Sequence, residues 1–210
     1  MEIEINSVSI PVFNGKVGLS MSGGADSSLL LYILLSNKKE TLEVFTLVSD
    51  HKGRISAKIT TNVIDKCIEL TGNNNVNHHI VYVDKQNDEN LFRLPRKMIS
   101  ENKINVIYTA VTANPPKDIA DNFLTSVANS EHNKRDPLIY RPISDGNWCT
   151  PFVNTNKIKI AEMYESLGLL ETLFPLTRSC ELITSNSNFL GHCGNCWWCR
   201  ERFWGFKRLI

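Results

Sequence analysis

Apolar and polar residues alternate along the first twelve positions of the chain. The apolar members of this alternation are Ile3, Ile5, Val8, Ile10 and Val12. A period of two is typical of a β-strand, and the dipeptide Asn14-Gly15 that follows favours a tight hairpin turn. We therefore predict that residues 1–15 contribute an added N-terminal hairpin strand and that Lys16–Met21 form the second arm of the hairpin.

Short apolar runs then alternate with stretches in which apolar residues recur every three or four positions. The apolar runs predict buried strands at Leu42–Val48, His79–Val83 and Ile104–Ala110. The helical spacing predicts helices over Asp26–Ser36, from Ile59 to the stop at Gly72, over Asn87–Glu101 with a break, kink or late start at Pro95, and over Asp118–Ala128. Strands that alternate with helices predict an α/β fold, in which a parallel sheet is covered on both faces and binds ligands at the carboxyl ends of its strands.

The last third of the chain has a different pattern. Residues from Ser130 to Thr150 are mostly loop formers and include the turn Asp145-Gly146, so we predict a long loop there. Helical spacing returns between Ile158 and Leu167, and a tail rich in cysteine follows. We expect one α/β domain over residues 1–175 and a small metal-binding lobe over residues 176–210 that packs on it.

Composition and charge exclude several classes of protein. The 210 residues carry 23 Lys and Arg against 22 Asp and Glu, a formal net charge of +1. This balance excludes a disordered chain and gives no electrostatic reason to expect nucleic acid or an anionic membrane as the main partner. No apolar run approaches the length of about 20 residues that a membrane span needs, and the N-terminus begins with acids where a signal peptide has bases. We expect a soluble cytoplasmic protein, and we leave a homodimer open.

The segment Ser22-Gly23-Gly24-Ala25-Asp26-Ser27 lies where a predicted strand gives way to a predicted helix. Two glycines let successive backbone N–H groups face an anion, and the N-terminal end of the helix adds its positive dipole. The hydroxyls of Ser22, Ser27 and Ser28 can donate to phosphate oxygens, and Asp26 can hold Mg²⁺ or cap the helix. We interpret the turn as a site for a phosphate chain, and the alternative is a plain turn with Asp26 as the helix N-cap.

Four of the six cysteines gather near the C-terminus, at Cys180, Cys193, Cys196 and Cys199. Four thiolates can close a tetrahedral shell around Zn²⁺ and leave no position open for water, which is typical of a structural site. An iron–sulfur cluster and free thiols are the alternatives, and His192 is a substitute ligand if Cys180 lies far away. The neighbouring aromatic residues are expected to dock the lobe on the main domain, with a surface for stacking nucleic-acid bases as the alternative.

The glycine turn resembles the SGGxDS signature of the PP-loop ATP pyrophosphatases. Together with the ending Cys193-Gly194-x-Cys196-x-x-Cys199-x-x-Arg202, it resembles the 7-cyano-7-deazaguanine synthase family over most of the chain. Further matches to that family are Pro151-Phe152, Lys157, Ile160-Ala161 and Ser179-Cys180. The resemblance implies a Rossmann-like fold of the adenine nucleotide alpha hydrolase type and a zinc site made by the four cysteines.

The same resemblance implies a reaction and a set of residues. Such enzymes adenylate the carboxylate of 7-carboxy-7-deazaguanine with ATP and Mg²⁺, let ammonia displace AMP to form an amide, and use a second ATP to dehydrate the amide to a nitrile. The residues expected in catalysis are Asp26, Lys157 and Asp118. Those expected to bind ATP are Ser20, Ser22, Gly23, Gly24, Asp26, Ser27, Ser28, Val48, His51, Lys157 and Arg178.

Two motifs that hold the substrate in that family are altered. A PGRN motif has no counterpart beyond Leu94-Pro95-Arg96-Lys97, and a YPDCRxxF motif is reduced to residues 116–123, which keep Asp118 and Phe123. The alternatives are therefore another acceptor, such as a tRNA to be thiolated or a peptide or protein in a phage or antiphage system, and a non-catalytic nucleotide-binding module. Thiolation would need a reactive cysteine near the turn, either Cys67 or Cys149.

Overall fold

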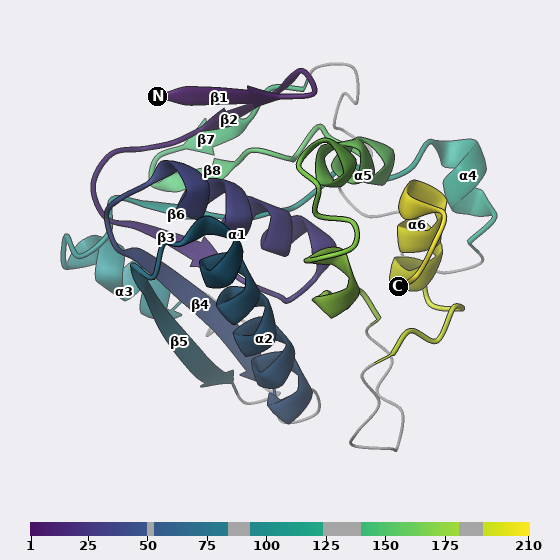
Figure 1. Ribbon diagram of the computed structural model, residues 1–210. Coiled ribbons are helices and arrows are strands. Elements are labelled where there is room, and N and C mark those ends of the chain that lie inside the picture. Colours follow the sequence, from purple (N-terminus) through teal and green to yellow (C-terminus); the bar gives the residue numbers. More distant parts are fainter. Residues whose placement is uncertain (50–52, 84–92, 124–139, 181–190) are drawn as a thin grey trace.

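The computed structural model describes residues 1–49, 53–83, 93–123, 140–180 and 191–210. A six-stranded sheet forms its centre, with the strand order β5-β4-β3-β6-β8-β7 (Figure 1). The five parallel strands are β3 (Val17–Ser20), β4 (Leu42–Ser49), β5 (Val76–Val83), β6 (Val106–Tyr108) and β8 (Trp148–Thr150). β7 (Ile143–Asp145) runs antiparallel at one edge. The predicted α/β fold with a mainly parallel sheet is confirmed.

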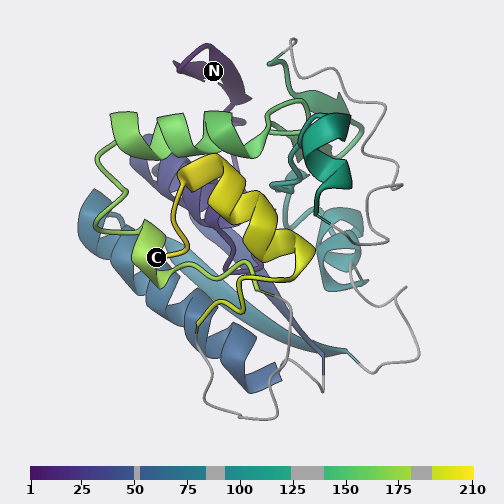
Figure 2. The same ribbon diagram turned by 90° about the vertical axis from the view of Figure 1, so that its right-hand side faces the viewer.

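Helices cover both faces of this sheet. The helices of the described residues are α1 (Ala25–Asn37), α2 (Gly53–Thr71), α3 (Arg93–Ser100), α4 (Lys117–Asp121), α5 (Lys157–Ser166) and α6 (Trp197–Phe206), with a 3₁₀ helix at Phe174–Leu176. α1, α2 and α5 pack on one face, whereas α3 packs against Phe45 and Ile107 on the other. Figures 1 and 2 show α6 beside α5, at the end of the molecule away from α3. Pro95 lies in the first turn of α3, where a missing N–H is tolerated. Residues 84–92 lie outside the described residues, so the helix start predicted at Asn87 is untested.

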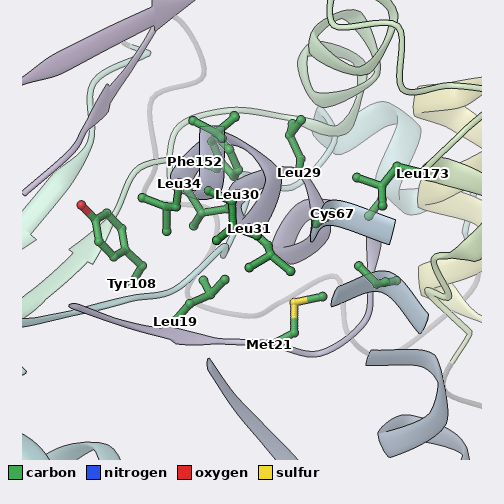
Figure 3. Close-up of a cluster of buried hydrophobic side chains, with 14 of the residues drawn as sticks. Leu19, Met21, Leu29, Leu30, Leu31, Leu34, Cys67, Tyr108, Phe152 and Leu173 are labelled. Carbon is green, nitrogen blue, oxygen red and sulfur yellow. The ribbon is translucent and has the colours of Figure 1, made fainter. Parts of the chain in front are cut away.

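The main core lies between the sheet and α1. Nine of the thirteen residues of α1 are buried, because this helix is apolar on nearly every side. Figure 3 shows its leucines packed over Leu19, Met21 and Tyr108. Since β3 and α1 are both buried, the turn that joins them is held on both sides.

The N-terminal hairpin is present, but its predicted second arm is wrong. β1 (Glu2–Ile5) pairs with β2 (Val8–Pro11), and the turn is Asn6-Ser7, whose φ angles are 48° and 66°. Two positive φ angles fit the tight turn that matches strand twist, and asparagine tolerates them. The run Val17–Leu19 is buried throughout, unlike a strand with one exposed face, and therefore lies in the central sheet. The Tyr108 hydroxyl donates to the Pro11 carbonyl over 2.8 Å and anchors the hairpin.

The long loop predicted over Ser130–Thr150 is also partly wrong. Its last residues form the β7–β8 hairpin, in which Ile143 pairs with Thr150 and Gly146 turns with a φ of 54°. Trp148, Cys149 and Thr150 favour strands, and β8 completes the parallel sheet beside β6. Residues 124–139 lie outside the described residues, so the end predicted for the helix over Asp118–Ala128 is untested; α4 itself ends at Asp121. Among the described helices, none has the length and apolar character of a membrane span.

Candidate functional site

The glycine turn lies at the carboxyl end of β3, where the strand order reverses between β3 and β6. In open α/β sheets this reversal opens the crevice in which ligands bind. Gly23 has a φ of +78°, and a Cβ there would lie 2.8 Å from Ile59 Cγ2 on α2, so only glycine fits. Gly24 is the N-cap of α1, and no side chain among the described residues caps this end of the helix. The first N–H groups of α1 are thus available to an anion.

The three serines of the turn have different surroundings. Ser22 is exposed, and its hydroxyl accepts from the Gly24 N–H over 3.2 Å and lies 3.0 Å from the Ser27 hydroxyl. Ser27 and Ser28 are buried and donate to the Gly24 carbonyl. Ser22 is therefore the hydroxyl that a phosphate can reach. Ser28 lies on the buried side of the helix, and its contact with phosphate stays a prediction.

Lys157 connects the turn to α5 and α6. It is the first residue of α5, which Asn156 caps by accepting from the Lys159 N–H. Its Nζ donates to Asp26 Oδ2 over 2.5 Å and lies 3.7 Å from Glu201 Oε2. Lys157 and Glu201 are each 4% exposed. Asp26 and Lys157, both predicted from the sequence, are thus brought together across 131 positions of the chain.

Burial and charge oppose each other in this cluster. Burial disfavours the charged form of Lys157, but Asp26 and Glu201 together outweigh it and raise the pKa of this lysine. For Glu201 burial is the larger effect, and it raises the pKa of this carboxyl group. Asp26 Oδ1 is buried and has no hydrogen-bond partner among the described residues. Since Lys157 occupies only Oδ2, the other carboxylate oxygen suits a divalent cation such as Mg²⁺.

Arg202 fixes the segment that precedes Cys180. This arginine is fully buried, and burial lowers its pKa to about 10. It donates to the hydroxyls of Thr177 and Ser179 over 2.8 and 3.2 Å. Between these two residues the Arg178 N–H donates to the Gly23 carbonyl over 2.8 Å. The backbone of Arg178 therefore contacts the glycine turn. The side-chain Nε of Arg178 donates to the Gly191 carbonyl.

The four predicted cysteine ligands converge. The sulfur atoms of Cys180, Cys193, Cys196 and Cys199 all lie within 4.8 Å of one another and could hold a metal. Burial opposes the thiolate of Cys193, but N–H groups of Cys196 and Asn195 donate to its sulfur and help lower its pKa to about 7. His192 is not part of this group. Its Nε2 accepts from the Ser179 N–H over 3.2 Å and so steadies the residue beside Cys180.

The aromatic tail docks as predicted. Phe206 stacks on Phe174 with ring centroids 4.2 Å apart and belongs to the main core. Trp197 is buried and makes a T-shaped contact with Phe123 beyond α4, with ring centroids 5.0 Å apart. Phe203 is 55% exposed. Most of these rings therefore fasten the C-terminal segment to the rest of the molecule.

The remaining predicted residues are spread out. Ser20 is the partly exposed last residue of β3, Val48 is buried in β4, and His51 lies outside the described residues. Asp118 is exposed on α4, and no hydrogen bond or ion pair among the described residues joins it to the glycine turn. The role of Asp118 stays a prediction.

Three polar groups near this edge of the sheet escaped the sequence analysis. Glu201 contacts Lys157. The sequence signal that could have indicated this contact is that Glu201 is the single acid within an aromatic and basic helix. Asn114 Nδ2 and Thr155 Oγ1 are buried without a partner among the described residues, in the segments that follow β6 and β8. Buried polar groups usually find partners, so these two suit contacts with a ligand.

No protein-family model matches the sequence, and no curated protein matches it at a significant level. Solved structures with a similar fold include the following two. NMN synthetase from Francisella tularensis is 12% identical, with a TM-score of 0.48 over 92% of this chain and 78% of that one. The U34-tRNA thiolase NcsA from Methanococcus maripaludis with its 4Fe-4S cluster is 15% identical, with a TM-score of 0.45 over 83% of this chain and 62% of that one. Both similarities concern the fold alone.

Proposed function

We propose that this chain is an ATP-dependent enzyme of the PP-loop class that activates a carboxylate by adenylation. The observation that carries the proposal is the buried Lys157, which binds Asp26 in the first turn of an uncapped helix behind a glycine turn. A plain structural turn would need neither a buried cation nor a carboxylate with one unpaired oxygen. Both groups are those that a magnesium–triphosphate complex requires.

Each part of the site has a task in this reaction. The N–H groups of α1 and the Ser22 hydroxyl would hold the pyrophosphate portion of ATP, and Asp26 Oδ1 would hold Mg²⁺. Lys157 would neutralise phosphate charge. An oxygen of the substrate carboxylate attacks the α-phosphorus, the bond from that phosphorus to the bridging oxygen breaks, and pyrophosphate leaves. Positioning and charge neutralisation supply most of the catalysis, so no nucleophilic side chain is needed.

The acceptor that fits the sequence resemblance is 7-carboxy-7-deazaguanine or a related carboxylate. Ammonia would then attack the acyl carbon and displace AMP, which yields the amide. The amide oxygen would attack the α-phosphorus of a second ATP and release pyrophosphate, and loss of AMP, which carries that oxygen, and of a proton would leave the nitrile. Asp118 is the residue we assign to the edge of the substrate base. Its exposed position on α4 leaves it able to contact a ligand.

Thiolation through Cys67 or Cys149 has less support. Both cysteines are fully buried in the main core. Burial raises the pKa of Cys67 to about 12 and raises that of Cys149, which disfavours the thiolate needed for sulfur transfer. We therefore assign these two residues to packing.

We infer that the four-cysteine site holds a single Zn²⁺ ion. Sulfur atoms at about 2.3 Å from zinc lie about 3.8 Å from one another in a tetrahedron. Cys193 Sγ and Cys199 Sγ are 3.8 Å apart. A cluster with one iron per cysteine would spread its ligands further apart than around one ion. With all four positions filled by protein, the ion would be structural and would supply no catalytic water.

The test is a pyrophosphate-release assay with ATP and Mg²⁺, with and without 7-carboxy-7-deazaguanine plus ammonium. We expect release that depends on the acceptor and falls about 100-fold or more in Asp26→Asn. Glu69→Gln is the control, since Glu69 is an exposed acid paired with Lys66 on α2. Calorimetric binding of ATP without any release of pyrophosphate would favour the non-catalytic module. No binding of ATP would refute the whole proposal.

A further inference from the structure

The helix α6 carries two of the four predicted metal ligands and also two charged residues of the proposed ATP site. Cys196 is the N-cap of α6, and Cys199 lies in the first turn. Glu201 and Arg202 lie two and three residues beyond Cys199 and are 4% and 0% exposed. An ion held by the two cysteines would therefore fix the position of both charged residues.

The first connection runs from α6 to Asp26 through Lys157. Glu201 Oε2 lies 3.7 Å from Lys157 Nζ, and the same Nζ donates to Asp26 Oδ2. A Cβ on Gly205 would lie 2.6 Å from Lys157 Cγ and 2.7 Å from the Lys157 carbonyl oxygen, so α6 touches the lysine backbone itself. The position of α6 thus determines the position of the Lys157 backbone and side chain.

The second connection reaches the glycine turn. Arg202 holds Thr177 and Ser179, and the N–H of Arg178 between them donates to the Gly23 carbonyl. The next residue, Cys180, is the fourth sulfur of the cluster. The metal site is therefore tied to both the lysine and the loop that would grip the phosphates.

We propose that Glu201 is a positioning residue for Lys157 and that metal at the four-cysteine site sets the affinity for ATP. This inference rests on the proposed ATP site. Asp26 now holds the lysine, and it must share its carboxylate once it coordinates Mg²⁺. Glu201 then keeps the buried lysine paired and aimed at the phosphates, since an unpaired charge is costly in the interior.

The experiment measures binding of ATP and of adenosine by calorimetry, in the presence of Mg²⁺, for the metal-loaded protein and its variants. We expect Glu201→Gln to weaken ATP binding about tenfold or more while adenosine binding is unchanged, because Lys157 acts on phosphates alone. Glu201→Asp keeps the charge and should recover most of the loss. Glu162→Gln is the control, since Glu162 pairs with Lys159 on the outside of α5.

The metal is tested on the unmodified protein. Removal of bound metal with a chelator should weaken ATP binding by a similar factor, and added Zn²⁺ should restore it. If Glu201→Gln does not fold, the effect of metal removal on ATP binding tests the inference by itself. ATP binding that is equal in wild type, Glu201→Gln and the metal-depleted protein would overturn the inference and leave the proposed function intact. Failure of the metal-loaded wild type to bind ATP would refute both.

Discussion

Four charges balance one another around the first residue of α5. Lys157 faces Asp26 and Glu201, and the fully buried Arg202 adds a second positive charge close by. Two cations and two anions form a neutral group, which is how a protein interior tolerates so much charge. A change to any one of them leaves another unbalanced, so this cluster is sensitive to single substitutions.

The backbone of the turn is sensitive for a different reason. Gly23→Ala places a side chain at a φ of +78° and against Ile59, whereas Gly72→Ala meets the same left-handed strain at +66° with nothing within 4 Å. We expect Gly72→Ala to lower the unfolding free energy by about 1 kcal/mol and Gly23→Ala by about 2–4 kcal/mol, together with loss of ATP binding. Urea unfolding of both variants measures the difference. Equal losses would show that the turn is not crowded.

The buried thiol of Cys67 makes stability depend on pH. Burial raises its pKa from the ordinary value of 9.0 to about 12 in the folded protein. The unfolded chain therefore loses this proton at lower pH, so the contribution to stability is complete below pH 9 and is lost as the pH rises. Between these two values the unfolding free energy should fall by about 1.4 kcal/mol per pH unit more in wild type than in Cys67→Ala. Parallel pH profiles in chemical denaturation would contradict this account.

The spacing of apolar residues predicts those helices and strands whose formation depends mainly on their own sequence. The steps from α1 to β4 and α2 follow directly from helical spacing and an apolar run, because α1, β4 and α2 span 13, 8 and 19 residues. The hairpin turn was misplaced because Asn14-Gly15 has the stronger local signal, whereas the central sheet takes Val17–Leu19 as a parallel strand. Asp26, Lys157 and the cysteines were found through motifs. Glu201 was not, since its partner lies 44 positions earlier and only the packing of α6 on α5 brings them together.

The approach of α6 to α5 predicts an unusual sign for one substitution. Within a helix alanine is favoured over glycine by about 1 kcal/mol. At Gly205, however, a Cβ would lie 2.7 Å from the carbonyl oxygen of Lys157, which is backbone and cannot rotate away. We expect Gly205→Ala to lower the unfolding free energy by about 1–3 kcal/mol and to weaken ATP binding, as measured by urea unfolding and calorimetry. A more stable variant would mean that the two helices are further apart.

At the scale of the whole molecule, the C-terminal segment packs into the main core. Phe206 contacts Phe174 and Tyr164, and the Tyr164 hydroxyl donates to the Ala25 carbonyl at the start of α1 over 2.8 Å. The same core thus holds the phosphate turn, α5 and the helix that carries the metal ligands. Residues that are far apart in the sequence share one environment, and we expect them to unfold together.

Removal of the metal tests whether the C-terminal segment and the main core unfold together. Three of the four tryptophans, Trp197, Trp198 and Trp204, lie in α6, so their fluorescence reports on the C-terminal helix, whereas far-ultraviolet circular dichroism reports on the whole fold. Since α6 shares the core, we expect a chelator to lower the melting temperature and the two signals to keep a single, coincident transition. The shift should be several degrees or more, because structural zinc sites contribute about 10 kcal/mol in small domains. A tryptophan transition that precedes the loss of circular dichroism would instead show a separate lobe that melts alone.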